Sequence, residues 1–181
     1  KIIVTNSQKA RLAVDERYQE RQAQCQEALH DLQTVIAIQN LSELTADVFE
    51  QVQEMIRRPV CLRRARHAVT ENQRTIQAVD ALNKGDIREF GQLMNASHLS
   101  LKEDFEVSCE ELDILVEEAW EIEGVLGSRM MGAGFGGCTI SIVENDAVNE
   151  FVSRVGSHYK ERTGRTAEFY IMETGNGASE V

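Results

Sequence analysis

The chain of 181 residues is long enough for one domain or for a large part of a longer protein, and its 42% apolar residues suffice for a core. Its formal net charge of −11 argues against a nucleic-acid partner, because the phosphates would be repelled. No apolar run approaches the roughly 20 residues of a membrane span, so no membrane contact is expected.

The cysteines indicate the cellular compartment, and the first residues indicate whether the chain is part of a longer protein. The four cysteines stand far apart without a Cys-x-x-Cys pair, which predicts neither a metal site nor a disulfide framework and fits a reducing cytoplasm. No secretory signal peptide is recognisable. The chain opens on Lys1-Ile2-Ile3-Val4, without Met and within an apolar strand, so we expect it to be the later part of a longer protein.

The first half of the chain reads as a short strand followed by helices. Residues 2–4 predict the strand, and a helix is expected from about residue 8 to 32, with an apolar side formed by Val14, Tyr18, Cys25 and Leu29. Thr45 is the expected N-cap of a second helix, which Pro59 is expected to end. A third helix is expected from about residue 62 to Gly85.

Two capping pairs then predict further helices. Asp86 with Glu89, and Ser108 with Glu111, each have the spacing at which a side chain caps the backbone of the first turn. Most of the acid-rich stretch 103–123 is interpreted as the solvated face of a helix.

The last third of the chain changes to strand periodicity. Strands are expected at about 125–131, 138–143 and 166–172, with a helix from about residue 148 before a turn at Gly164 and a loop-like tail over 174–179. The predicted class is α+β. The element order is that of the ferredoxin-like split βαβ sheet, with the first crossover expanded into a helical insertion of about 8–121.

Two local patterns leave alternatives open. The glycine-rich stretch RMMGAGFGGC, residues 129–138, joins two strands, and its glycines serve either a tight turn with positive φ or a close backbone approach. It lacks the Lys and Ser or Thr of a P-loop. A basic stretch offers either an anion site or ordinary pairing with acids; it comprises Arg57, Arg58, Arg63, Arg64, Arg66 and Arg74.

Several segments together resemble one family. RMMGAGFGGC is similar to the third motif of the GHMP small-molecule kinases. Within this superfamily, four segments of the chain resemble the galactokinase family and follow one another in the same order as in that family. They are VTNSQKARLAVDERYQERQAQC (4–25), RRARHAVTENQRT (63–75), NASHLSLKEDFEVSCEELDILVEEA (95–119) and GVLGSRMMGAGFGGCT (124–139). The resemblance runs from residue 2 to about 172 and concerns the C-terminal half of the family, the GHMP-kinase C-terminal domain.

This resemblance implies a reaction, and it implies which half of the protein holds the catalytic groups. The family phosphorylates the C1 hydroxyl of α-D-galactose with ATP and Mg²⁺. Its sugar motif, phosphate loop, metal ligands and catalytic Asp precede the part resembled here. We therefore expect no catalytic residue and no metal ligand in this chain, and we expect it to bind ATP and galactose jointly with the N-terminal half. The chain alone should be inactive, and it should self-associate through the exposed interdomain surface.

The resemblance also implies site residues. Tyr18 resembles the tyrosine that touches galactose, although without the family it reads as a core aromatic. Gly132, Gly134, Gly136 and Gly137 are expected to bring backbone against the active-site cleft. The motif more often has Thr at Met131 and in some members Gly at Ala133. His98 is expected either in the cleft or as a buried or capping residue, and His67 as structural.

Two other functions stay open at this point. A non-catalytic, galactokinase-like sugar-sensing regulator would differ in the segment that precedes this chain. A related GHMP sugar kinase would act on another sugar, such as an N-acetylated galactose.

Overall fold

The computed structural model describes residues 1–10 and 14–175, so most of the expected tail 174–179 lies outside the described residues. The chain divides into two compact units, one formed by Lys1–Arg11 with Ser108–Val181 and the other by Leu12–Val107. We call them the sheet unit and the helical unit.

The sheet unit contains four strands in the spatial order β2-β3-β1-β4. They are β1 (Ile2–Asn6), β2 (Val125–Met131), β3 (Cys138–Val143) and β4 (Glu168–Met172). All three pairings are antiparallel, and β1 lies between β3 and β4, with Ile3 opposite Ser141 on one side and Ile171 on the other. This confirms the predicted ferredoxin-like sheet with the first strand inside it.

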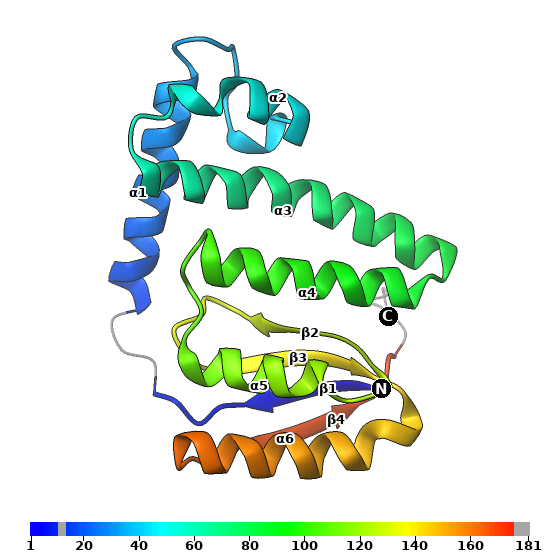
Figure 1. Cartoon of the computed structure of the whole chain (residues 1–181). Helices are drawn as coiled ribbons and strands as arrows, with labels where there is room; N and C mark the ends of the chain where they lie inside the picture. Colours follow the sequence, from blue (N-terminus) through cyan, green and yellow to red (C-terminus); the bar gives the residue numbers. More distant parts are fainter. Residues whose placement is uncertain (11–13, 176–181) are drawn as a thin grey trace, which may run out of the picture. The chain divides into compact units, whose positions relative to one another are not determined.

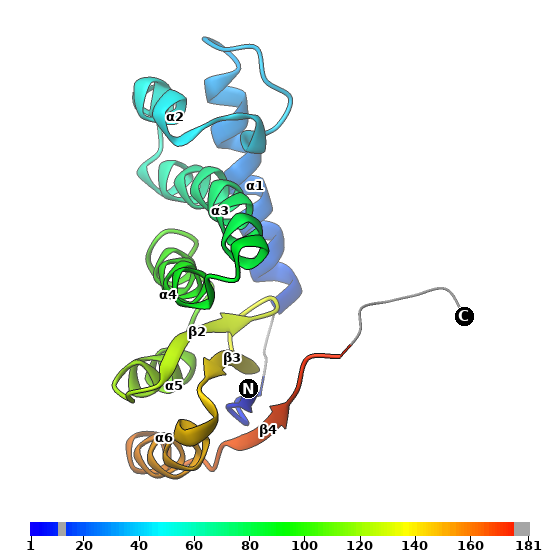
Figure 2. The same cartoon turned by 90° about the vertical axis from the view of Figure 1, so that its right-hand side faces the viewer.

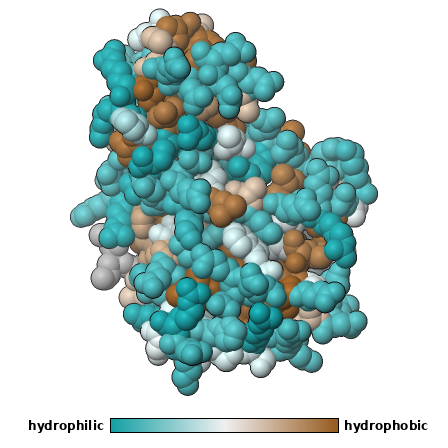
Figure 3. All heavy atoms as spheres, viewed as in Figure 1, coloured by the Kyte–Doolittle hydropathy of each residue, from teal (hydrophilic) through white to brown (hydrophobic). Residues whose placement is uncertain are grey.

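Two helices cover one face of this sheet (Figures 1 and 2). They are α5 (Glu110–Trp120) and α6 (Val148–Thr163), the latter entered through the short helix η3 (Asn145–Ala147). The core between the two layers holds Ile3, Ile114, Leu115, Ala119, Val143, Phe151, Val155 and Tyr159. Figure 3 shows that the surface of α5 and α6 turned away from the sheet is mainly hydrophilic. Each helix therefore has one apolar side, which the strands cover.

The opposite face of the sheet is apolar as well. Partners in an antiparallel register point to the same side, and the partners Val4, Ile140 and Tyr170 lie on the side away from Ile3. Other apolar members of this face are Ile2, Met131, Cys138, Ile142 and Met172. Tyr170 is 51% exposed and Met172 is 42% exposed. In residues 1–10 and 108–175 both long helices lie on the other side, so no helix of the sheet unit covers this face.

The helical unit consists of α1 (Val14–Leu32), α2 (Ala46–Val52), α3 (Pro59–Lys84) and α4 (Ile87–Glu103), with the short helices η1 (Leu41–Glu43) and η2 (Gln53–Met55). Helix α3 packs against both α1 and α4 (Figure 1). The core of the unit includes Leu29, Leu32, Leu41, Phe49, Ile56, Cys61, Ala65 and Val69. Along α3, Ala65 and Val69 are buried, whereas Ile76 and Val79 are exposed.

Three predicted helix boundaries are confirmed by their contacts. The Thr45 side chain accepts a hydrogen bond from the backbone N–H of Val48. The Asp86 carboxylate accepts one from the N–H of Glu89 at 2.9 Å. Gly85 ends α3 with a φ of 72°, a left-handed conformation that glycine adopts without steric cost.

Other predicted boundaries are wrong for local reasons. Pro59 does not end α2 but begins α3, where its missing N–H costs nothing. Ser108 does not cap α5: Cys109 holds the N-cap position, and the Ser108 hydroxyl donates instead to the Asp113 carboxylate at 2.5 Å. Helix α1 does not include residues 8–10, while β1 runs two residues beyond its predicted end.

Candidate functional site

The glycine-rich segment is the tip of the β2–β3 hairpin in the sheet unit. Gly132, Gly134, Gly136 and Gly137 all have positive φ, between 75° and 126°. The turn interpretation is therefore correct, because side chains other than glycine are strained in this region. Phe135 lies among them with a φ of 58° and is 6% exposed, which fixes the middle of the loop in the protein interior.

The same loop also makes a close backbone approach. A Cβ on Gly136 would lie 3.1 Å from the carbonyl oxygen of Lys9 and 3.3 Å from its Cγ. The Ser7 N–H donates to the Gly137 carbonyl at 2.8 Å. Both interpretations of the glycines thus apply, and the close approach at Gly136 is to residues 7–9, which follow β1.

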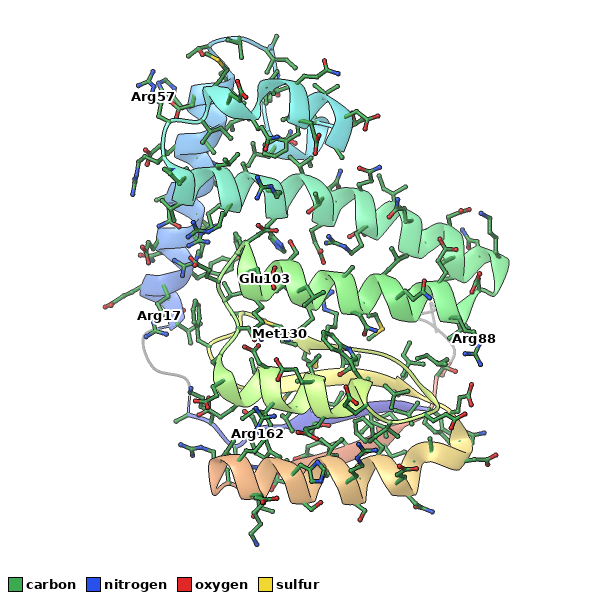
Figure 4. The ribbon with its side chains drawn as sticks, viewed as in Figure 1. Arg17, Arg57, Arg88, Glu103, Met130 and Arg162 are labelled. Atoms are coloured by element: carbon green, nitrogen blue, oxygen red, sulfur yellow. The ribbon has the colours of Figure 1, made fainter. Side chains whose placement is uncertain are left out.

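Tyr18 lies on α1 in the helical unit, next to Arg17, which Figure 4 labels. Its side chain is 43% exposed, so it is not a core aromatic of this chain. The sugar contact implied by the family stays a prediction. The glycine loop belongs to the sheet unit, whereas Tyr18 belongs to the helical unit.

A buried arginine and its neighbours fix the middle of α1. Arg64 on α3 is 1% exposed; its Nε donates to the Gln24 side chain at 2.8 Å, and its guanidinium also binds Glu106. One turn before Gln24, Arg21 donates to the backbone carbonyls of Phe105 and Glu106 at 2.8 and 3.0 Å. The guanidinium of Arg64 holds the pKa of Glu106 below its usual value. The part of α1 that follows Tyr18 is therefore tied to α3 and to the chain after α4.

The two histidines of interest are interior residues of the helical unit. His98 on α4 is 1% exposed, which favours the buried alternative. His67 on α3 is 7% exposed, stacks on Phe105 with ring centroids 4.5 Å apart, and has its Nδ1 2.9 Å from the Ser100 hydroxyl. These contacts match the structural role expected for His67.

The basic stretch pairs with acids, as the plainer of its two interpretations predicts. Its ion pairs are Arg57–Asp31, Arg58–Glu27, Arg63–Glu106, Arg64–Glu106, Arg66–Asp104 and Arg74–Glu71. Because every arginine of the stretch has a carboxylate partner, these residues do not gather into an anion site.

Two glutamates of the acid-rich stretch depart from the solvated role predicted for most of it, although half of its ten acids are exposed. Glu111 and Glu118 on α5 have side chains only 14% and 15% exposed. Glu118 binds His158 at 2.6 Å and Arg162 at 3.2 Å, both on α6; Figure 4 labels Arg162. Glu111 pairs with Lys9 at 2.5 Å. Both carboxylates therefore form ion pairs within the sheet unit.

The remaining candidate chemistry concerns thiols, metals and membranes. All four cysteines are free thiols, and burial raises the pKa of Cys25 to about 11. Among residues 1–10 and 14–175, no group of three or more His, Cys, Asp or Glu side chains could hold a metal ion. No helix in the described part of the chain combines the length and apolar character needed to cross a bilayer.

Residues 7–9 are the part of the site that the sequence analysis missed. They form a kinked loop in which Gln8 has a φ of 55°, and the Asn6 side chain accepts a hydrogen bond from the Gln8 N–H at 3.0 Å. The dipeptide Asn6-Ser7 indicates a turn, because Asn and Ser side chains readily form hydrogen bonds with the backbone two residues further along the chain. The same dipeptide also suits a helix start at residue 8, and that prediction is wrong.

A comparison with protein families agrees with this fold. Residues 78–161 match the model described as GHMP kinases C terminal. Together with the sheet and the glycine hairpin, this match shows that the fold is that of a GHMP-kinase C-terminal domain.

The more specific similarity is to galactokinases. The chain is 50% identical to the galactokinase of Levilactobacillus brevis over 180 residues, and 50% identical to that of Clostridium acetobutylicum over 181 residues. These matches cover 99% and 100% of this chain but 46% of each relative. The chain thus spans a little under half the length of the curated relatives it matches, and corresponds to their C-terminal half.

Solved structures agree. The crystal structure of Lactococcus lactis galactokinase complexed with galactose superposes with a TM-score of 0.93 at 44% identity, covering 99% of this chain and 46% of that one. An L. major mevalonate kinase superposes with a TM-score of 0.56 at 21% identity, covering 90% of this chain and 38% of that one. The latter likeness concerns the fold alone.

The approach of Gly136 to Lys9 leads to a stability prediction. Gly136→Val should lower the free energy of unfolding more than Gly164→Val, by roughly 1–3 kcal/mol, because the new side chain is overpacked against the Lys9 backbone. Gly164 is the matched control, since it has a positive φ of 70° but no atom within 4 Å of the place that a Cβ would occupy. Urea unfolding measures both variants. Equal losses would mean that backbone conformation alone requires glycine at 136.

Proposed function

We propose that this chain is the C-terminal half of a galactokinase, which transfers the γ-phosphoryl group of ATP to the C1 hydroxyl of α-D-galactose. The observation that carries the proposal is the 50% identity to galactokinases across essentially the whole chain. The close superposition on a galactokinase complexed with galactose supports it.

In this proposal the glycine loop shapes the site without holding phosphate by side chains. Residues 132–137 read Gly-Ala-Gly-Phe-Gly-Gly, so they offer neither the Lys nor the Ser or Thr of a phosphate cradle. Phosphoryl transfer depends mainly on positioning and on charge stabilisation. A rigid loop without polar side chains lets backbone from this half approach the phosphate-binding part of the other half.

ATP, Mg²⁺ and the catalytic base belong, in this proposal, with residues outside the chain. The described residues bring together no group of carboxylates and imidazoles suited to a metal ion, so they do not fit Mg²⁺ by themselves. Tyr18 is the residue of this chain proposed to contact the sugar. The free thiols support placing the protein in the cytoplasm.

The first test concerns Tyr18. In the complete enzyme, Tyr18→Phe should raise the galactose KM by about 2- to 13-fold, because it removes one hydrogen bond to a neutral partner and keeps the ring. The ATP KM should stay unchanged. Steady-state kinetics and thermal unfolding are measured together. Unchanged galactose kinetics with a lowered Tm would assign Tyr18 to folding instead of substrate binding.

The second test asks what the chain does alone. The purified 181-residue chain should not phosphorylate galactose, since the groups that position and stabilise the transferring phosphoryl group lie outside it. A coupled assay with ATP, Mg²⁺ and galactose, run beside the complete enzyme, measures this. N-acetylgalactosamine serves as the alternative sugar in both assays. Turnover by the isolated chain within about a hundredfold of the complete enzyme would place the catalytic groups in this half.

The third test concerns self-association of the isolated chain. We propose that two copies associate through the apolar sheet face that carries Tyr170 and Met172, because apolar area without a cover favours association. Met172→Lys should shift the molar mass measured by light scattering toward the monomer. The control Ile76→Lys changes an exposed apolar residue of the helical unit and should have no effect. A monomer at every concentration, or disruption only by the control, would contradict the proposal.

A further inference from the structure

The loop of residues 7–9 is held by contacts from four parts of the sheet unit: the glycine loop, α5, α6 and the turn after α6. Its first residue, Ser7, donates its N–H to the Gly137 carbonyl at 2.8 Å, and the Ser7 hydroxyl accepts from the N–H of Lys9 at 3.3 Å. Arg165, between α6 and β4, donates to the Gln8 carbonyl at 3.4 Å. The backbone polar groups of this kinked segment are thus largely satisfied within the protein.

Tyr159 on α6 supplies the most buried of these contacts. Its side chain has no exposed surface, and its hydroxyl donates to the Ser7 carbonyl at 2.6 Å. Burial raises the pKa of this phenol, so the hydroxyl keeps its proton at neutral pH. Ser7 therefore bonds Tyr159 through its carbonyl and Gly137 through its N–H, and joins α6 to the glycine loop through one residue.

The Lys9–Glu111 ion pair holds the other end of the segment. Lys9 Nζ lies 2.5 Å from a Glu111 oxygen, and Arg165 Nε lies 3.8 Å from the other oxygen. The hydrogen bond to Glu111 raises the pKa of Lys9. Burial acts to raise the pKa of Glu111, but the hydrogen bond and the charge of Lys9 counter it and the pKa is lowered. Both groups are charged at neutral pH, and the pair fixes the residue whose carbonyl faces Gly136.

We propose that Tyr159 and the Lys9–Glu111 pair are positioning residues for the glycine loop. They hold residues 7–9 in one place, and this segment in turn limits where Gly136 and Gly137 can lie. The inference rests on the proposed function, in which this loop borders the site of phosphoryl transfer. Small displacements of such groups affect the chemical step strongly, by up to about a hundredfold for 1 Å.

The expected signature is a change in kcat without a change in galactose KM. The glycine loop is proposed to act on the transferring group and not on the sugar, and an interaction needed in the transition state lowers kcat when it is lost. Tyr159→Phe removes only the hydroxyl. It should lower kcat by about 2- to 13-fold, the factor that corresponds to one lost hydrogen bond, and leave the galactose KM unchanged.

Tyr170→Phe is the matched control in the same unit. Tyr170 is 51% exposed, and its hydroxyl donates to Glu168 on the same strand instead of to residues 7–9. In the 181-residue chain, this variant should leave amide exchange in residues 132–137 at the wild-type rate. A Tyr159→Phe variant that lowers kcat and raises the galactose KM together with a fall in Tm would show a general folding role and overturn the proposal.

A second pair of variants tests the ion pair by rescue. Lys9→Met keeps the aliphatic carbons that face Gly136 but removes the charge, and should lower kcat as Tyr159→Phe does. Lys9→Arg retains a cation for Glu111 and should restore most of the activity. Equal kcat in Lys9→Met and wild type, or equal losses in Lys9→Met and Lys9→Arg, would count against the pair.

Hydrogen exchange in the 181-residue chain separates this inference from the proposed function, because it needs no activity. Tyr159→Phe should speed amide exchange in residues 132–137 by about 2- to 13-fold and leave that of β4 unchanged. If the complete protein fails to phosphorylate galactose while the loop still loosens, the positioning role stands and the proposed function fails. Unchanged loop exchange would overturn the positioning role itself.

Discussion

The pairing of β1 with β3 and β4 is the constraint on which the rest of the sheet unit depends. Strand β1 comes first in the chain, yet both of its neighbours lie beyond residue 137. Because β1 is inside the sheet, the backbone that leaves it at Ser7 is delivered next to the end of the β2–β3 hairpin. The meeting of residues 7–9 with the glycine loop thus follows from strand order, and side chains from α5 and α6 then fix it.

The strands could be predicted because their signals are local. Residues 138–143 alternate between the two sides of the sheet and are rich in β-branched side chains, which suits a strand whatever its neighbours. Caps were predictable where one side chain had no better partner, as at Thr45 and Asp86. At Ser108 the prediction is wrong because α5 begins one residue later, with Cys109 at the N-cap position, while the Ser108 hydroxyl donates a hydrogen bond to Asp113; spacing alone does not reveal this shift.

The geometry of the candidate site could be predicted only where the residue type alone determines the local conformation. Four glycines in a hairpin indicate positive φ, but the burial of Phe135 among them depends on packing from elsewhere in the fold. Glu111 belongs to an acid-rich run that reads as solvated, and its partner Lys9 lies about a hundred residues earlier. Likewise, a helical periodicity placed Tyr18 with core residues, whereas it lies near the start of α1, where the helix is mostly exposed.

The central place of β1 also sets the order in which the protein can mature on the ribosome. Strand β1 is translated before the helical unit, and this unit, with its own core, is complete before either neighbouring strand exists. Until then the hydrogen-bonding edges of β1 and its apolar Ile3 have no native partner, and such an edge can pair with other chains. A nascent chain with this topology is therefore open to misassembly during synthesis, whatever the stability of the finished fold.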